Sequence, residues 1–257
     1  RDVAIWRGKY HHCPVLLGSA TPSLESMARA QKGVYQLLTL KERVNGKSLP
    51  SVEIIDMKDY DEMIRKIEKI GRVCYKSEGN ITEESAERFI RNILKRGHES
   101  VIEHEAVTVR MICDRGITHE IVRHRIASYS QESTRYCNYS GDKFGNEITV
   151  IDIAGGFSYD LNNETDLQKY EAWMRAMENA EKSYFELIEL GATPQEARSV
   201  LPNSLKTEIV VTMNLRSWRN FFRLRCDSHA HPQMREVANI ALDLFKKRLP
   251  IFFDDIN

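Results

Sequence analysis

The sequence lacks a long apolar run, a paired-cysteine motif and an excess of charge of one sign. None of its apolar stretches approaches the ~18 residues that a membrane-spanning helix needs, and no signal peptide is recognisable. Its five cysteines are scattered without a CxxC pair, which favours free thiols in a reducing compartment over disulfides or a zinc site. These absences predict a cytoplasmic protein without a membrane partner.

The charge balance excludes a strongly basic or acidic protein. Lys plus Arg equals Asp plus Glu at 37 each, so no overall field draws the chain towards nucleic acid. The 257 residues are 42% apolar and 29% charged, an ordinary composition for a globular protein with a substantial core. Any anion-binding site must therefore be local, and we expect no nucleic-acid partner.

A phosphate-binding loop is also missing, although one short stretch imitates its end. In "NGKS", Asn45–Ser48, the required glycine five residues before Gly46 is replaced by Lys41. The residues from about Arg1 to about Asp56 resemble the primosomal replication-restart helicase around its "SAT" motif, Ser19–Thr21. Without a phosphate loop or an acidic helicase box, we interpret residues 1–50 as a helicase-like fragment that is loosely packed or disordered and not independently functional.

Residues 51–257 carry a consistent pattern of helices and strands. Strand patterns occupy 51–56, 106–113, 147–153 and 208–213, and helical patterns occupy 82–97, 166–190, 193–202, 217–225 and 232–250. Thr82 is the expected N-cap of the first helix, Gly97 its terminator, and Thr193 with Glu196 a capping box. The elements follow no regular βαβ rhythm, so we expect an α+β domain.

The stretch "RHRIASYSQESTRY", residues 123–136, spaces its cations with small hydroxylated residues instead of acids. Such a mixture suits a multiply charged anion, because guanidinium forks bind phosphate and hydroxyls satisfy the remaining oxygens. It follows the helix-like "THEIV", so its side chains should fan out at an element end. The alternative, a hydrolase with Ser133 as nucleophile and His124 as base, lacks the GxSxG elbow and is disfavoured.

A second cluster, "RGHESVIEHE", places His98 directly after the terminator Gly97 and His104 six residues on. A metal site would need a third ligand, His119 or His124, and a ligand register that is missing. We interpret His104 as a packed or hydrogen-bonding histidine and His98 as functional.

A third cluster, "NLRSWRNFFRLRCDSHAH", places Asn214, Arg216 and Asn220 along one helical stripe. The opposite stripe is apolar, with Trp218, Phe221 and Phe222. Arg223, Arg225 and His229 have no glutamate one turn on, so we expect other groups to balance them. Arg225 and His229 would lie one turn apart if the helix continued.

Together these motifs resemble the flavin-dependent thymidylate synthase family over about residues 51–257. The resemblance is carried by Arg123-His124-Arg125 followed after seven residues by Ser133, and by "RGHES", "EARSVLP" and residues 214–230. It implies an α+β fold with an antiparallel sheet, a homotetramer whose sites combine several subunits, and reductive methylation of dUMP to dTMP. The implied cofactors are FAD and NADPH, with methylenetetrahydrofolate as cosubstrate. Ligands and neighbouring chains would then balance the free arginines.

The resemblance also implies roles for individual residues. FAD would be held by His98, Ser100, Arg123, His124, Arg125, Ile126, Gln131, Asn214, Arg216, Asn220 and His229. The substrate dUMP would be held by Glu120, Gln131, Ser133, Thr134, Arg135, Arg198 and Arg225, of which Ser133, Arg135 and Arg225 are the catalytic candidates. Glu120 and Gln131 depart from the family, which often has Gln and Glu there. The alternative function is a remnant helicase or nucleic-acid-binding module.

Overall fold

The computed structural model describes residues 47–141 and 146–256. The chain divides into two units, Arg1–Glu42 and Arg43–Asn257, and all described residues belong to the second. The prediction that residues 1–50 are loosely packed or disordered therefore lies almost wholly outside the described residues. Of that fragment the structure describes residues 47–50, and the first two of these form a short strand, β1 (Lys47–Ser48).

The centre of the second unit is an antiparallel sheet in the order β2-β3-β6-β4. Its strands are β2 (Ser51–Asp56), β3 (Ala106–Asp114), β4 (Ser128–Gln131) and β6 (Lys206–Asn214). Burial alternates along β3 and β6, so Val109 and Val211, which face each other in register, lie in the core while Arg110 and Val210 lie on the half-exposed face. β1 pairs in parallel with β5 (Val150–Ile151).

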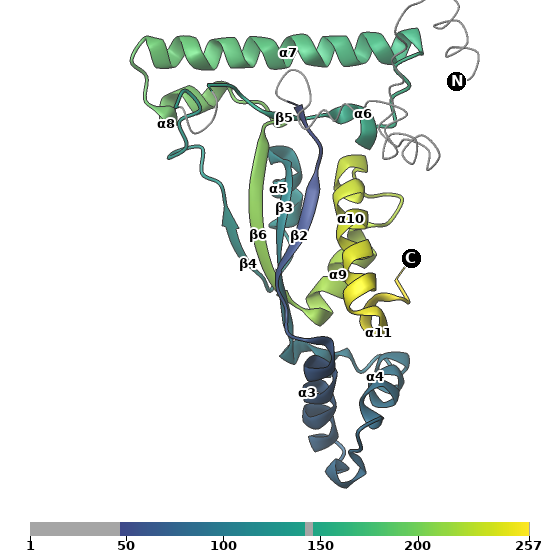
Figure 1. The fold of residues 1–257 in the computed structure, drawn as a ribbon. Coiled ribbons are helices and arrows are strands. Elements are labelled where there is room, and N and C mark those ends of the chain that lie inside the picture. The colour runs from purple at the N-terminus through teal and green to yellow at the C-terminus, as the bar shows by residue number, and fades with distance from the viewer. Residues whose placement is uncertain (1–46, 142–145, 257) are drawn as a thin grey trace, which may run out of the picture. The chain divides into compact units, whose positions relative to one another are not determined.

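Helices cover one face of the sheet, as Figure 1 shows. They are α5 (Arg115–Ile121), α9 (Leu215–Arg225), α10 (Pro232–Arg248) and α11 (Pro250–Phe253). Their apolar stripes pack with the buried strand residues into one hydrophobic core. Trp218 is central to it, because its ring packs on Phe221, Phe222 and Phe245 and its Nε1 donates to the Val107 carbonyl at 3.0 Å.

A helical pair, α3 (Tyr60–Val73) and α4 (Ser85–Lys95), extends this core together with the 3₁₀ segment η2 (Glu99–His104). α4 starts three residues later than the expected cap. Thr82 does not cap it, because the Ser85 hydroxyl donates to the Thr82 carbonyl and accepts from the Thr82 amide instead. The predicted stop is confirmed, since Gly97 has a φ of 72°, in the left-handed region that glycine adopts without strain.

The long helix α7 (Glu164–Glu189) lies over a second, smaller core with the short helices α8 (Pro194–Ala197) and η4 (Arg198–Val200). The capping box of Thr193 and Glu196 is confirmed. The predicted strand at 147–153 is shortened to β5. At the start of the predicted strand, the Ile148 amide donates to Glu181 at 2.8 Å instead of to a neighbouring strand. At its end, Asp152 is the N-cap of α6 (Ile153–Gly156).

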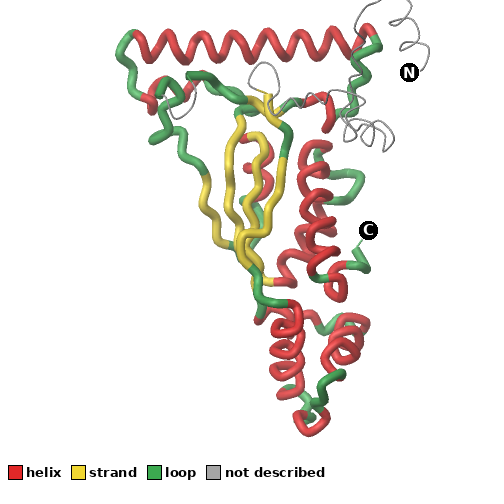
Figure 2. The backbone as a smooth tube through the Cα atoms, in the orientation of Figure 1, coloured by secondary structure: helices red, strands yellow, loops and turns green. Residues whose placement is uncertain are grey.

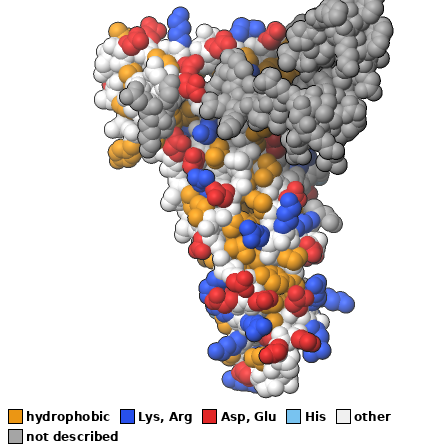
Figure 3. Space-filling model, viewed as in Figure 1, with side chains coloured by type: hydrophobic (Ala, Val, Ile, Leu, Met, Phe, Trp, Pro, Cys, Tyr) orange, Lys and Arg blue, Asp and Glu red, His pale blue; other side chains and the backbone are white. Residues whose placement is uncertain are grey.

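The described residues combine helices with a four-stranded antiparallel sheet and show no regular βαβ repeat, so the predicted α+β class is confirmed (Figure 2). No helix among residues 47–141 and 146–256 is long and apolar enough to cross a membrane. On the face shown in Figure 3, acidic and basic side chains are interspersed over the part of the chain that the structure describes.

Candidate functional site

The residues Arg123–Ala127 connect the end of α5 to the edge strand β4, and they do not all point outward as predicted. Arg123 and Arg125 are exposed, and Ile126 is 84% exposed. His124 is turned inward and is 8% exposed. The expectation that this segment fans out at an element end is therefore right for the arginines and wrong for the histidine, whose ring packs against the core.

His124 is held as a neutral acceptor. Its ring meets Phe221 edge-on at 4.8 Å, and its Nε2 accepts a hydrogen bond from Arg225 Nε at 2.8 Å. Burial and the neighbouring Arg225 charge lower the pKa of His124 to about 4. The Ser133 hydroxyl accepts a hydrogen bond from the Arg135 amide at 3.3 Å, and the His124 Nε2 is occupied by Arg225. The described residues therefore show no base–nucleophile pair between His124 and Ser133. The disfavoured hydrolase alternative has no support in this geometry.

Arg225 is balanced within its own chain. Its Nη1 lies 2.6 Å from Glu120 Oε2, and its Nη2 donates to the Glu120 carbonyl at 3.1 Å. Glu120, Arg225 and His124 thus form a continuous carboxylate–guanidinium–imidazole chain that ties α5 and the loop after it to the end of α9.

The other cations of α9 also find acidic partners in this chain, which corrects the expectation that ligands and neighbouring subunits balance them. Arg216 pairs with Glu103 at 2.5 Å and Arg223 with Glu99 at 2.8 Å. His229 lies 2.7 Å from Asp227 and is almost fully exposed. These partners are far away in sequence or lie off the helix, so a search for glutamates one helical turn on does not find them.

Among the predicted site residues, four arginines have no acidic partner in the described part of the chain: Arg123, Arg125, Arg135 and Arg198. The first three flank β4, and Arg135 lies over the Tyr136 ring at 5.4 Å. Unpaired, exposed guanidiniums are the donor set that phosphate groups require. The residues therefore fit a ligand with several phosphates, such as a dinucleotide beside a nucleoside monophosphate.

Two predicted polar residues next to these arginines are held by the fold. The Gln131 amide donates to the hydroxyls of Thr118 at 3.0 Å and Thr207 at 3.4 Å. Thr134 is buried, in contrast to its neighbours Ser133, which is half-buried, and Arg135, which is exposed. Gln131 therefore presents a fixed side chain and Ser133 an accessible hydroxyl at the end of the edge strand.

The remaining predicted residues lie on η2 and α9. His98 accepts or donates at Nδ1 to the Tyr75 hydroxyl at 2.7 Å, and Ser100 and Asn220 are exposed. Asn214 caps α9 by accepting from the Ser217 amide at 2.8 Å. The helix does not continue to His229, since α9 ends at Arg225, so the condition for placing the two residues one turn apart is not met.

Arg219 was not among the predicted site residues, although its spacing on α9 places it with the buried residues. Leu215, Trp218, Arg219 and Phe222 follow the spacing of one helical face, and all four are buried. A charged residue on the apolar stripe of a helix must have partners in the core. Its partners are Glu99 and Asp255.

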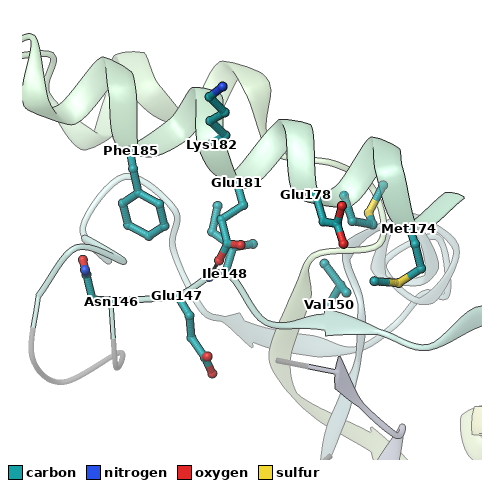
Figure 4. Close-up of a pocket in the computed structure, with 10 residues that line it drawn as sticks. Asn146, Glu147, Ile148, Val150, Met174, Glu178, Glu181, Lys182 and Phe185 are labelled. Atoms are coloured by element: carbon teal, nitrogen blue, oxygen red, sulfur yellow. Dashed lines mark hydrogen bonds between the residues drawn. The ribbon is translucent and has the colours of Figure 1, made fainter. Parts of the chain in front are cut away.

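A groove of about 600 Å³ lies away from all of these residues, between α7 and residues 146–150. In Figure 4, Phe185 points from α7 towards this loop, and Glu178 and Met174 lie over Val150. None of the predicted site residues lines it. Among the residues that the structure describes, no group of three His, Cys, Asp or Glu side chains is placed to hold a metal ion.

Comparisons with known proteins agree with the motifs. Residues 55–251 match the family "Thymidylate synthase complementing protein". The chain is 37% identical to a flavin-dependent thymidylate synthase of Pyrococcus furiosus over 169 residues, 65% of this chain and 66% of that one. It is 37% identical to the one of Geobacter sulfurreducens over 191 residues, 72% and 78% of the two chains. For that of Corynebacterium efficiens the identity is 34% over 208 residues, 74% and 78%.

The chain therefore spans just under two thirds of the Pyrococcus relative and more of the other two. The family match begins near the end of β2 and covers β3, β4 and β6, the helices from α3 to α10, and every motif that carries the candidate site, from His98 to His229. On this combination of sequence match and geometry, the chain belongs to the thymidylate synthase complementing protein family, that of the flavin-dependent thymidylate synthases.

Proposed function

We propose that this chain catalyses the reductive methylation of dUMP to dTMP, with methylenetetrahydrofolate as carbon donor and with FAD and NADPH as the reducing system. The observation that carries the proposal is the set of unpaired guanidiniums, Arg123, Arg125, Arg135 and Arg198, within the family match. Ligands with several negative charges would compensate these cations. Domain assignment follows the same proposal: residues 51–257 form the synthase, and residues 1–50 are not independently functional.

Roles can be proposed for the residues in contact with each ligand. FAD would be held by Arg123, Arg125 and Ile126 from the loop before β4, by His98 and Ser100 from η2, and by Asn214, Arg216, Asn220 and His229 from α9 and beyond, with His124 and Gln131 beside them. Exposed cations and amides there can bind its diphosphate and ring edges. Bound and reduced, the flavin supplies the hydride that completes the methyl group.

The substrate dUMP would lie against the end of β4. Arg135 and Arg198 would bind its phosphate, with Ser133, Thr134 and Gln131 beside it, and Arg225 with Glu120 would face the uracil ring. A fixed guanidinium stabilises negative charge that develops on the ring when its C5 attacks the carbon donor. The contacts of Arg225 to Glu120 and His124 hold it in place before the substrate arrives, which lowers the cost of orientation.

Apart from buried His124 and Thr134, the predicted residues are exposed or half-buried, and none of them lines the groove of Figure 4. We therefore infer that the site is completed by other copies, in a homotetramer. Such an arrangement would also cover Ile126 and Tyr136, which are 84% and 79% exposed on either side of the edge strand. A cytoplasmic location completes the proposal.

The first test is direct. The full chain is incubated with FAD, separated from excess by gel filtration, and inspected for flavin absorbance that bleaches with NADPH. Release of tritium from dUMP labelled at C5 then measures the reaction. We expect Arg123→Gln/Arg125→Gln to lose the flavin and Arg175→Gln, an exposed arginine on α7, to keep it. A colourless wild-type chain would contradict the proposal.

The runner-up function, a remnant helicase or nucleic-acid-binding module, rests on residues that lie almost wholly outside the described ones. The family match begins at residue 55, after that fragment. DNA-stimulated ATP hydrolysis by the full chain would support this alternative, and no observation on the described residues favours it.

A further inference from the structure

Arg219 is a fully buried guanidinium in the middle of α9, with 1% of its surface exposed. A buried cation is costly unless its donors are satisfied. Its Nη1 and Nη2 donate to the two oxygens of Asp255 at 2.7 and 2.6 Å, its Nε donates to Glu99 at 3.0 Å, and Nη1 also donates to the Phe252 carbonyl. One side chain therefore joins α9, η2 and the C-terminal segment.

The contact with Glu99 is reinforced on the same helix. Arg223, one turn beyond Arg219, donates to Glu99 Oε1 at 2.8 Å, so two guanidiniums grip one carboxylate. Although burial would raise the pKa of Glu99, the hydrogen bonds and charges of Arg223 and Arg219 hold it below its ordinary value. Arg216 pairs with Glu103 at 2.5 Å, four residues along η2. η2 is thus fastened to α9 at both ends.

η2 and the residue before it carry candidates for flavin binding. His98 and Ser100 flank Glu99 in sequence, and Asn220 follows Arg219 on α9. We propose that Arg219, acting through Glu99, is a positioning residue that sets His98 and Ser100 in register with the flavin-binding residues of α9. This inference rests on the proposed function, because it assigns Arg219 a purpose in the same flavin site without contact to the flavin.

If Arg219 only stabilised the fold, replacing it would change stability and leave flavin binding unchanged. A buried ion pair often contributes no more stability than well-packed apolar residues of similar volume. The aromatic rings of Phe222, Phe245 and Phe253 already pack α9 against α10 and α11. The fold therefore has another source of cohesion here, whereas the directional bonds to Glu99 and Glu103 connect η2, which directly follows His98, to α9.

The test compares two variants that each remove one carboxylate from the same guanidinium, Glu99→Gln and Asp255→Asn. We expect Glu99→Gln to raise the Kd and KM for FAD about tenfold, because it removes the negative charge that both Arg219 and Arg223 bind, with kcat little changed. Asp255→Asn, which leaves the contacts of Glu99 in place, should lower the melting temperature and leave both constants within about twofold. Arg219→Met should behave like Glu99→Gln.

Equal FAD constants in all three variants and the wild type would overturn the inference and leave Arg219 a stabilising residue. A second measurement, hydrogen exchange of residues 98–104, does not need flavin. We expect faster exchange there in Glu99→Gln than in Asp255→Asn, and equal rates would also overturn the inference. If the wild-type chain retains no flavin, the proposed function fails, while the exchange data still decide whether Arg219 fixes this segment.

Discussion

At the scale of single residues, the arginines of the candidate site have two kinds of surroundings. Those on α9 are tied to Glu99, Glu103 and Glu120, so their charge is compensated and their geometry is fixed. Those around β4 are exposed and uncompensated. The first kind orients groups, and the second kind attracts an anion, since an unpaired cation loses little solvation when a phosphate reaches it at the surface.

Arg225 tests the orienting kind. It reaches Glu120 and His124 at once, and a lysine, with one compact ammonium, cannot reproduce this fork. We expect Arg225→Lys to lower kcat at least about tenfold and the free energy of unfolding by about 1–2 kcal/mol. Arg91→Lys, which alters an exposed pair with Glu87 at 3.5 Å, should change stability by less than about 0.5 kcal/mol. Equal effects of the two would contradict a fixed Arg225.

His124 predicts a pH dependence of stability. Its folded-state pKa of about 4 lies below the ordinary 6.5, so the unfolded chain takes up the proton first. The stabilisation by neutral His124 is therefore complete above pH 6.5 and is lost as the pH falls towards 4, by up to about 3 kcal/mol.

The comparison variant is His124→Gln, which keeps an acceptor for Arg225 but does not titrate. Urea unfolding at several pH values should give a smaller fall in unfolding free energy for this variant than for the wild type between pH 6.5 and 4. Parallel curves would show that His124 does not titrate as its surroundings indicate.

At the scale of elements, most helices and strands were predictable because their signals are local. The apolar periods of α4 and α9, the alternation of β3 and the capping box at Thr193 are each confirmed within a few residues. One error came from a tertiary contact that replaced a local one: the Glu181 carboxylate, which binds the amide of Ile148 in the predicted strand 147–153, lies 33 positions along the chain. The other, the expected Thr82 cap, came from a local contact with Ser85.

Site geometry was less predictable than site composition, for the same reason. Motif spacing indicated which polar residues gather, but the direction of His124 and the partners of Arg216, Arg223 and Arg225 depend on pairs about 100 or more residues apart. The burial of Arg219 could have been predicted, because Arg219 shares the helical spacing of Leu215, Trp218 and Phe222 on α9. Long-range pairing is fixed by the packing of whole elements, and no short stretch carries it.

The packing of α3 against α4 and η2 gives a test at this scale. A Cβ added to Gly71 would lie 2.7 Å from the Phe89 ring and 2.9 Å from Val101, whereas one added to Gly79 would meet nothing within 4 Å. We expect Gly71→Ala to lower the free energy of unfolding by about 1–3 kcal/mol despite the better helix propensity of alanine. Gly79→Ala should change it by less than about 0.5 kcal/mol; a stabilised Gly71→Ala would contradict the close approach.

At the scale of the whole molecule, the proposed homotetramer makes a complementation prediction. If His98 and Arg135 of one site come from different chains, then His98→Ala and Arg135→Gln should each be inactive alone and partly active after mixing and reassembly. Sedimentation should give a mass four times the 29.8 kDa of one chain. A monomer, or a mixture as inactive as its components, would contradict sites built from several copies.

The most direct test of the central claim combines binding and turnover in one preparation of the full chain. Protein loaded with FAD and then gel-filtered should stay yellow and should bleach when NADPH is added. With methylenetetrahydrofolate and C5-tritiated dUMP added as well, it should release tritium in step with dTMP. Replacing Arg123 and Arg125 by Gln should abolish both flavin retention and release. Flavin retained equally by this double variant, or tritium released without any bound flavin, would contradict the assignment of these cations to the flavin.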